Sequence, residues 1–259
     1  MDKIKEELIQ LFDGMMPQIK SFKRKQYAGV FEEGFTEHKG VLAGITELCA
    51  EKTEEECEPI IEELASVIPD YAYDKLHKEP KMVRNRLEVD YNMNMAVYVI
   101  PILTYTHEAG CEKVAKRTVE LWNEKPVTSL TLGQASYEEI AGGFRKGFCF
   151  ITTAVCDSMD KPDDCYELTA LRSYRDHYLR RTEEGNALVE EYYDIAPYLV
   201  QVINMQKDAA EIYRNIYDDY LVPCIHCIEE NKNEECRHIY MDMVRGLQNK
   251  YLHVQEVRS

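Results

Sequence analysis

The segment CRHIYMDMVRGLQNKY, residues 236–251, spaces its apolar side chains three and four positions apart. These positions are Cys236, Ile239, Tyr240, Met243, Val244, Leu247 and Tyr251. An α-helix completes a turn in about 3.6 residues, so side chains with this spacing share one face of a helix. The segment therefore predicts an amphipathic helix with its apolar stripe buried.

The same spacing recurs along nearly the whole chain, and almost no stretch alternates apolar and polar residues as a strand does. Thr53 with Glu56, and Ser136 with Glu139, fit the capping box in which both side chains bond backbone N–H groups at a helix start. Prolines at positions 69, 80, 126, 162, 197 and 223 interrupt or kink the pattern. These features predict an all-α fold, a multi-helix bundle of antiparallel helices with no substantial β-sheet.

The least helical stretch is EKPVTSLTLGQA, residues 124–135, which carries a proline, a glycine and β-branched residues. A change of composition at this point suggests a boundary between two parts of the chain. We expect an N-terminal helical module over residues 1–135 and a C-terminal helical module over residues 136–259. A single continuous helical domain is the alternative.

The composition indicates an acidic protein with a buried core. Of the 259 residues, 45% are hydrophobic, and the formal net charge is -16. Nucleic-acid binding needs a cluster of Lys and Arg side chains, and the one basic run, KSFKRK at residues 20–25, is short. We interpret this run as a solvated helix end and expect no nucleic-acid partner.

Membrane and export signals are weak. The most apolar run, MAVYVIPIL at residues 95–103, is shorter than the ~20 residues of a spanning helix and contains Pro101, so we expect a buried helix. The opening MDKIKEELIQ lacks the apolar core of a signal peptide. Nine cysteines, an odd number without an export signal, are typical of reduced thiols. The sequence predicts a cytoplasmic protein with no membrane partner.

Three consecutive stretches resemble a known family. They are CFITTAVC (149–156), ELTALRSYRDHYL (167–179) and GNALVEEYYDIAPYLVQVI (185–203). Together, residues 149–203 resemble the CFI-box domain, a C-terminal module of bacterial proteins named for its Cys-Phe-Ile tripeptide. The chain departs from the family pattern at residues 153–156, where Ala-Ala-Tyr-Gly is usual, and at Tyr174, where phenylalanine is usual. The resemblance implies a portable bacterial module and no particular activity, and it assigns no role to Cys156.

Two thiols in this region are candidates for chemistry. Cys149 and Cys156 are seven positions apart, which on a helix is a rise of about 10 Å. A disulfide needs Cα atoms about 4.4–6.8 Å apart, so a redox pair of these two is excluded. Cys149 follows Gly142, Gly143 and Gly147, and a thiol that opens a helix has its thiolate favoured by the helix dipole. Cys149 is the candidate catalytic residue, and the alternative is that both thiols belong to the core.

The helix expected over residues 168–179 places a cation on its apolar face. Arg175 falls between Leu168 and Leu171 on a helical wheel, Arg172 flanks it, and Asp176 lies at the edge of the apolar arc. A buried guanidinium demands a carboxylate or carbonyl partner. Arg172, Arg175, Asp176 and Cys156 are therefore the candidate binding residues. The alternative is a structural ion pair between Arg175 and Glu190, Glu191 or Asp194, and His177 points away from the apolar arc.

The cysteines nearer the C-terminus allow an alternative interpretation as a metal site. Cys224 and Cys227 share a helical face, and a short turn brings Cys236 and His238 within reach, a set of ligands that suits zinc. The spacing does not match a zinc finger, and Cys236 belongs to an apolar stripe, so core thiols are favoured. No phosphate-binding glycine loop or nucleophile elbow is present, and we expect no cofactor.

These observations lead to two hypotheses of function. The first is a thiol-centred pocket that binds or modifies a small molecule or a peptide. The second is a non-catalytic helical module for protein interaction or oligomerisation, in which tyrosines and methionines contact a protein partner or a second copy of the chain.

Overall fold

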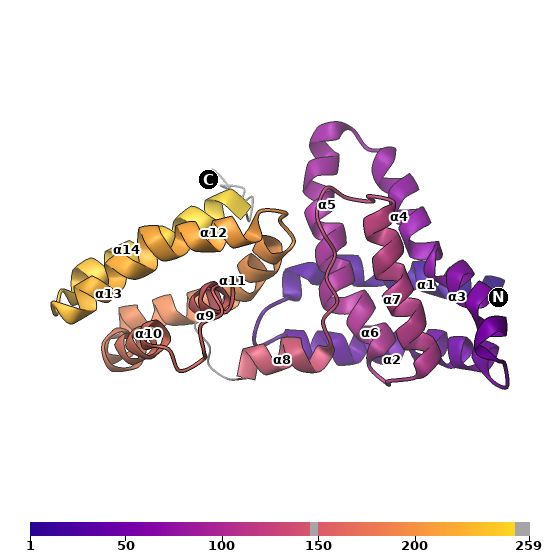
Figure 1. The fold of residues 1–259 in the computed structure, drawn as a ribbon, viewed down its shortest axis with the longest axis horizontal. Helices are drawn as coiled ribbons and strands as arrows, with labels where there is room; N and C mark the ends of the chain where they lie inside the picture. The colour runs from indigo at the N-terminus through magenta and orange to yellow at the C-terminus, as the bar shows by residue number, and fades with distance from the viewer. Residues whose placement is uncertain (146–149, 252–259) are drawn as a thin grey trace. The chain divides into compact units, whose positions relative to one another are not determined.

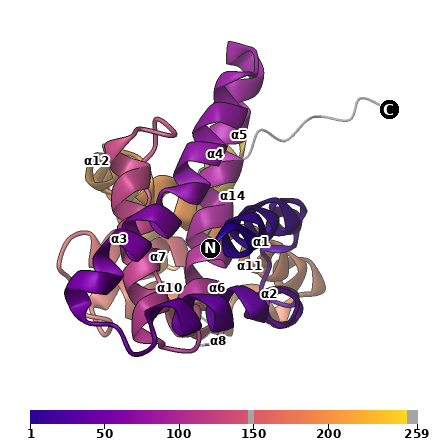
Figure 2. The ribbon, with the colours of Figure 1, turned by 90° about the vertical axis from the view of Figure 1, so that its right-hand side faces the viewer.

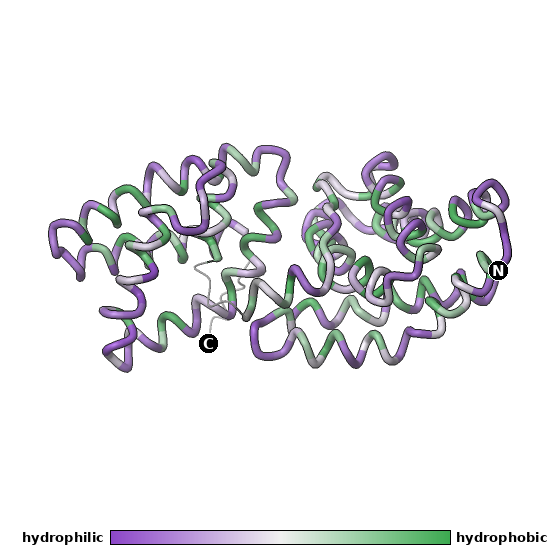
Figure 3. Tube along the Cα trace, turned by 60° about the horizontal axis from the view of Figure 1, so that its bottom comes forward, coloured by the Kyte–Doolittle hydropathy of each residue, from purple (hydrophilic) through white to green (hydrophobic). Residues whose placement is uncertain are grey.

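The computed structural model describes residues 1–145 and 150–251, and every regular element within these ranges is helical (Figure 1). The all-α prediction is confirmed. The chain forms two compact units, Met1–Gly142 and Gly143–Ser259. Hydrophobic and hydrophilic residues alternate along the tube of each unit, as amphipathic helices require (Figure 3). Among the described helices, none has the length and apolar character needed to span a bilayer.

Unit 1 contains seven α-helices, a 3₁₀-helix (η1) and a π-helix (η2), and an eighth α-helix continues past its end. The bounds are α1 (Asp2–Met15), η1 (Met16–Ser21), α2 (Tyr27–Cys49), α3 (Glu54–Ala65), α4 (Val67–His77), α5 (Lys81–Asn94), η2 (Met95–Val99), α6 (Ile100–Thr104), α7 (Ala109–Glu124) and α8 (Tyr137–Arg145). Helices α4 and α5 form a hairpin, visible in Figures 1 and 2. Both predicted capping boxes are present, at the starts of α3 and α8.

The run MAVYVIPIL lies at the centre of unit 1, where it forms η2 and most of α6 and is buried throughout. Proline has no N–H and its ring crowds the carbonyl four residues earlier, so the turn before Pro101 widens into a π-helix. That earlier carbonyl belongs to Val97, and the Tyr27 hydroxyl donates a hydrogen bond of 2.9 Å to it. The predicted buried helix is confirmed, with a π-helical turn that its proline explains.

Residues 125–136, which follow α7, are non-helical and are held by side-chain hydrogen bonds. The Asn123 amide bonds both backbone groups of Leu132 at 2.9 Å, and the Thr128 hydroxyl donates to Asn92 at 2.7 Å. These bonds attach the stretch to unit 1. The division between the units falls within α8, a few residues after the boundary that composition predicted.

Unit 2 carries the remaining elements. They are α9 (Phe150–Asp157), α10 (Tyr166–His177), the 3₁₀-helix η3 (Leu179–Arg181), α11 (Glu183–Asn204), α12 (Ala209–Ile216), the π-helix η4 (Tyr217–Leu221), α13 (Val222–Glu229) and α14 (Asn233–Tyr251). The π-helical turn η4 again ends two residues before a proline, Pro223. The stripe predicted over residues 236–251 faces the core, where Cys236, Met243 and Leu247 are buried.

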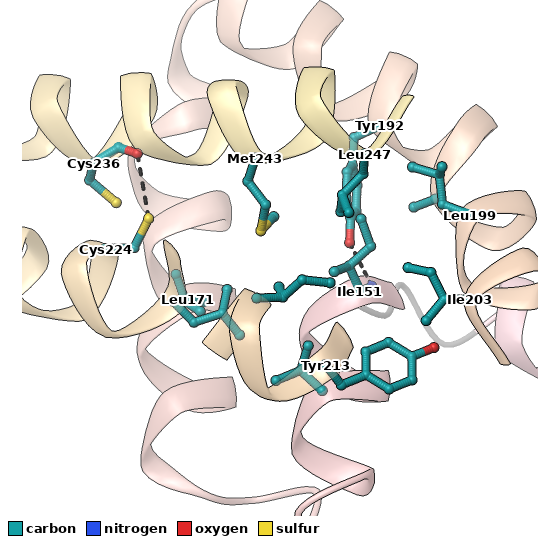
Figure 4. Packing of buried hydrophobic residues seen from close by; sticks show 14 of the residues in the cluster. Ile151, Leu171, Tyr192, Leu199, Ile203, Tyr213, Cys224, Cys236, Met243 and Leu247 are labelled. Carbon is teal, nitrogen blue, oxygen red and sulfur yellow. Dashed lines mark hydrogen bonds between the residues drawn. The ribbon is translucent and has the colours of Figure 1, made fainter. Parts of the chain in front are cut away.

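The core of unit 2 draws on most of its helices (Figure 4). Met243 and Leu247 of α14 meet Leu171 of α10 and Tyr192 of α11 in one cluster. The Tyr192 hydroxyl accepts a hydrogen bond of 2.9 Å from the backbone N–H of Ile151, which ties α11 to the start of α9. The unit therefore has a hydrophobic core of its own.

Candidate ligand-binding pocket

A pocket of about 120 Å³ lies between α10, η3, α11 and α14 of unit 2. Most of its lining is apolar: Leu171, Tyr174, Leu179, Leu188, Val189, Tyr192, Ile195, Tyr240, Met241 and Val244. Its polar lining consists of Arg175, Arg237, Arg245, Glu191 and Gln248. An apolar concavity with a few convergent polar groups is the usual form of a small-molecule site.

Helical periodicity explains how these side chains converge. On α14, Arg237, Tyr240, Met241, Val244 and Arg245 follow one another at steps of three, one, three and one, so they share one face of the helix. This face lies beside the buried stripe of Cys236, Met243 and Leu247, and its outer edge carries the arginines. The same helix therefore contributes both to the core and to the pocket.

Arg175 lines the pocket as a partly buried cation, with 14% of its side chain exposed. Its Nε and Nη2 donate to the two carboxylate oxygens of Asp176 at 2.7 and 2.8 Å, and its Nη1 donates to the Tyr193 hydroxyl at 2.7 Å. The carboxylate of the next residue, Asp176, therefore turns back onto the guanidinium, a partner that the sequence did not predict. The pairing lowers the pKa of Asp176.

The two other arginines come from α14. Arg237, with 26% of its side chain exposed, pairs through Nη2 with Glu234 at 2.9 Å. The Nε of Arg237 is buried and has no hydrogen-bond acceptor, which leaves one charged donor unused. Arg245 is exposed, and no carboxylate of the described residues forms an ion pair with it. The pocket therefore combines apolar walls with guanidinium groups that retain donors.

Two predicted binding residues lie away from this pocket. Arg172 donates to the backbone carbonyl of Asp163 at 2.9 Å and to its carboxylate at 2.7 Å. Cys156 is fully buried, and the Sγ of Cys165 lies 3.7 Å from its Sγ. Burial raises the pKa of the Cys156 thiol to about 12. Cys149, the predicted catalytic residue, lies outside the described residues.

The alternative of a metal site at Cys224, Cys227, Cys236 and His238 finds no support in the arrangement of these side chains. The three cysteines are buried, whereas His238 is exposed. The thiol of Cys224 donates to the backbone carbonyl of Cys236 at 3.7 Å, as a core thiol does (Figure 4). Within residues 1–145 and 150–251, no group of three or more His, Cys, Asp or Glu side chains is placed to hold a metal ion.

Three residues of interest were missed by reasoning from the sequence. Arg237 and Arg245 are eight positions apart on α14. This spacing, which can be read from the sequence, places both arginines on one face of the helix. Nothing in the sequence connects them with Arg175, because that juxtaposition depends on how α10, α11 and α14 come together around the pocket. Cys165 was missed because it lies at the end of a loop, where helical spacing gives no information.

Comparisons with family models, with curated proteins and with solved structures find no match to this chain. The resemblance of residues 149–203 to the CFI-box domain therefore stays a prediction.

Proposed function

We propose that unit 2 binds a small amphipathic anion, an apolar ring or short chain that carries one carboxylate or phosphate group. The observation that carries the proposal is the meeting of three arginines with apolar walls in one pocket. The apolar body of the ligand would pack against Leu188, Ile195 and Val244, and the anion would face Arg237 and Arg245.

The size of the pocket limits the ligand. A cavity of about 150 Å³ lined by aliphatic and aromatic side chains accommodates benzene. The pocket of unit 2, at about 120 Å³, suits a group of that order. A larger ligand would have to extend past Arg245 into solvent.

The charge of the pocket favours an anion over a cation. Three arginines and one glutamate line it, and the unused Nε of Arg237 is a donor. Guanidinium groups bind carboxylates and phosphates through paired hydrogen bonds, which are stronger than bonds between neutral groups. The paired Arg175 serves to shape the wall, because Asp176 and Tyr193 already occupy its donors.

The test compares three ligands that share a phenyl group and differ in charge: phenylacetate, phenethyl alcohol and phenethylamine. Binding to the full chain is followed by NMR titration or calorimetry. We expect phenylacetate to bind most tightly and Arg245→Gln to weaken it by about three- to tenfold, with little effect on the alcohol. Leu188→Trp fills the pocket and should abolish binding of both.

The matched control is Arg214→Gln, which removes an exposed arginine of unit 2 that does not line the pocket. Arg214→Gln should leave the affinity for each of the three ligands unchanged. A general effect of net charge would instead weaken the binding of phenylacetate equally in Arg214→Gln and Arg245→Gln. Equal binding of the acid and the alcohol, or undiminished binding to Leu188→Trp, would refute the proposal.

The functional thiol at Cys149 remains a separate prediction, and its test is independent of the pocket. Alkylation of the full chain by iodoacetamide should be faster at Cys149 than in the urea-unfolded chain, as an activated thiolate requires. An alkylation rate at Cys149 no higher than that of the unfolded chain would refute the prediction of an activated thiol. It would have no bearing on the proposal of anion binding.

The second hypothesis, an interaction module, has less support. In the described part of the chain, the exposed large apolar side chains are Met1, Met82, Val83 and Tyr166. Single apolar residues, and a pair such as Met82 and Val83, are normal on protein surfaces, and an interface requires a larger contiguous patch.

A further inference from the structure

Two thiols that are nine positions apart in the sequence lie together in unit 2. Cys156 belongs to the last turn of α9, and Cys165 occupies the N-cap position of α10, where its side chain makes no capping hydrogen bond. Their Sγ atoms are 3.7 Å apart, with the thiol of Cys165 directed at the sulfur of Cys156. A disulfide has an S–S distance of about 2.05 Å, so a shift of less than 2 Å would join them.

Backbone hydrogen bonds and one ion pair fold the loop between these two thiols back towards Cys156. The backbone N–H of Lys161 donates to the carbonyl of Cys156 at 3.0 Å, and that of Cys165 donates to Pro162 at 2.9 Å. Asp160 adopts a positive φ of 54°, which turns the chain. The ammonium of Lys161 is held by Glu167 of α10 and by the Tyr217 hydroxyl. These contacts hold the two thiols near each other before any bond forms.

The two thiols differ in access to solvent. Cys156 is fully buried, and its raised pKa keeps it protonated. Cys165 is partly exposed and lies at the N-terminal end of α10, where its sulfur can be reached by a reagent in solution. In contrast, the neighbouring thiols of Cys224 and Cys236 are both sealed in the core, with exposed fractions of 0%. A pair of thiols can react with a reagent in solution while the protein stays folded only if at least one of the two sulfurs is accessible.

We propose that Cys156 and Cys165 are a reversible disulfide site, oxidised by exchange with a small-molecule disulfide such as oxidised glutathione. Cys165 loses its proton, its sulfur attacks one glutathione sulfur to form a mixed disulfide, and one glutathione leaves as a thiolate. Cys156 then loses its proton, its sulfur attacks the Sγ of Cys165, and the second glutathione leaves as a thiolate. Both thiolates take up protons, so the two cysteines are oxidised and one glutathione disulfide is reduced to two thiols.

The cross-link would close a short loop between α9 and α10. Closure of a loop restricts the unfolded chain more than the folded one, and here the folded geometry is already close to that of the bond. We therefore expect oxidation to raise the Tm of unit 2 by about 5–10 °C and to leave the helical content unchanged.

The test begins with the full wild-type chain incubated with oxidised glutathione under native conditions. After remaining thiols are blocked, combined digestion with trypsin, chymotrypsin and an aspartate-specific endoproteinase cuts on both sides of each thiol, including after Phe150. Mass spectrometry should detect a cross-link between the peptides of Cys156 and Cys165. A cross-link of Cys165 to Cys149 instead, or no cross-link in the folded chain, would overturn the inference.

Two variants test the order of the steps. In Cys156→Ser, Cys165 should keep a stable mixed disulfide with glutathione, because no second thiol can displace it. In Cys165→Ser, the buried Cys156 should acquire no adduct. Cys236→Ser is the control for a sealed pair and should oxidise as wild type does. Circular dichroism establishes that each variant is folded, and adducts at both positions alike would contradict the proposed order.

Discussion

At the scale of single residues, Lys161 and Glu167 form a partly enclosed ion pair in unit 2. Glu167 has 14% of its side chain exposed and Lys161 27%, and the Tyr217 hydroxyl donates to the same carboxylate oxygen at 2.8 Å. The ammonium of Lys161, helped by this hydroxyl, lowers the pKa of Glu167 to about 2. Because this pKa is lower in the folded than in the unfolded chain, the charged carboxylate stabilises the fold.

This pair predicts an acid-dependent loss of stability. The contribution is fully present above about pH 5, because the unfolded carboxyl titrates near 4.3, and it is lost as pH falls towards 2. Glu167→Gln should therefore lower the stability of unit 2 by about 1–2 kcal/mol at pH 7 and make little difference near pH 2. The measurement is hydrogen exchange of peptides from α10, which reports the stability of unit 2. Tryptophan fluorescence would not serve, because the single tryptophan, Trp122, lies in unit 1.

The control for this prediction is Asp242→Asn, which removes an exposed carboxylate at the middle of α14. It should change stability by less than about 0.5 kcal/mol at any pH. An equal pH dependence of wild type and Glu167→Gln would show that the ion pair does not contribute.

At the scale of elements, two glycines in helices of unit 2 have opposite surroundings. A Cβ added to Gly185, in the first turn of α11, would lie 2.1 Å from the backbone oxygen of Leu179. A Cβ added to Gly246 on α14 would lie 4.0 Å from its nearest neighbour, the hydroxyl of Tyr220. Gly185 is therefore required by the close approach of η3, whereas Gly246 is not required by packing.

Substitution of each glycine by alanine tests this contrast. Gly185→Ala should destabilise unit 2 by about 1–3 kcal/mol, because the backbone of η3 has to move. Gly246→Ala should stabilise it by about 0.5–1 kcal/mol, because alanine is the better helix former in an open site. Urea denaturation of the two variants provides the comparison, and effects of the same sign would contradict it.

At the scale of the whole molecule, each unit has its own core. The cluster around Ile151, Leu171, Tyr192, Met243 and Leu247 draws on residues of unit 2 alone. A domain with a self-contained core folds without the rest of its chain.

We therefore expect the fragment of residues 143–259 to fold by itself. Its circular dichroism should be strongly helical, its thermal unfolding cooperative, and its affinity for phenylacetate within about twofold of that of the full chain, since the pocket lies within unit 2. A fragment that is helical but melts without a cooperative transition would show that its core depends on unit 1.

Several structural features were predictable from the sequence because they depend on neighbouring residues. The capping boxes at Thr53 and Ser136, the non-helical stretch after α7 and the buried stripe of α14 all follow from spacing within one or two turns. The placement of Arg175 on an inward-facing part of α10 follows from the same spacing. The partner of Arg175 does not follow from this spacing, because the rotamer of Asp176 decides which carboxylate the guanidinium contacts.

The sequence by itself determined an all-α chain, since helical periodicity, caps and prolines act over a few residues. Only the tertiary structure decided that Arg237 and Arg245 meet Arg175 around one pocket, and that Cys156 faces Cys165 rather than another thiol. The physical reason is that contacts between helices depend on the packing of whole faces and on the path of the intervening loops. No spacing within a single helix encodes that packing.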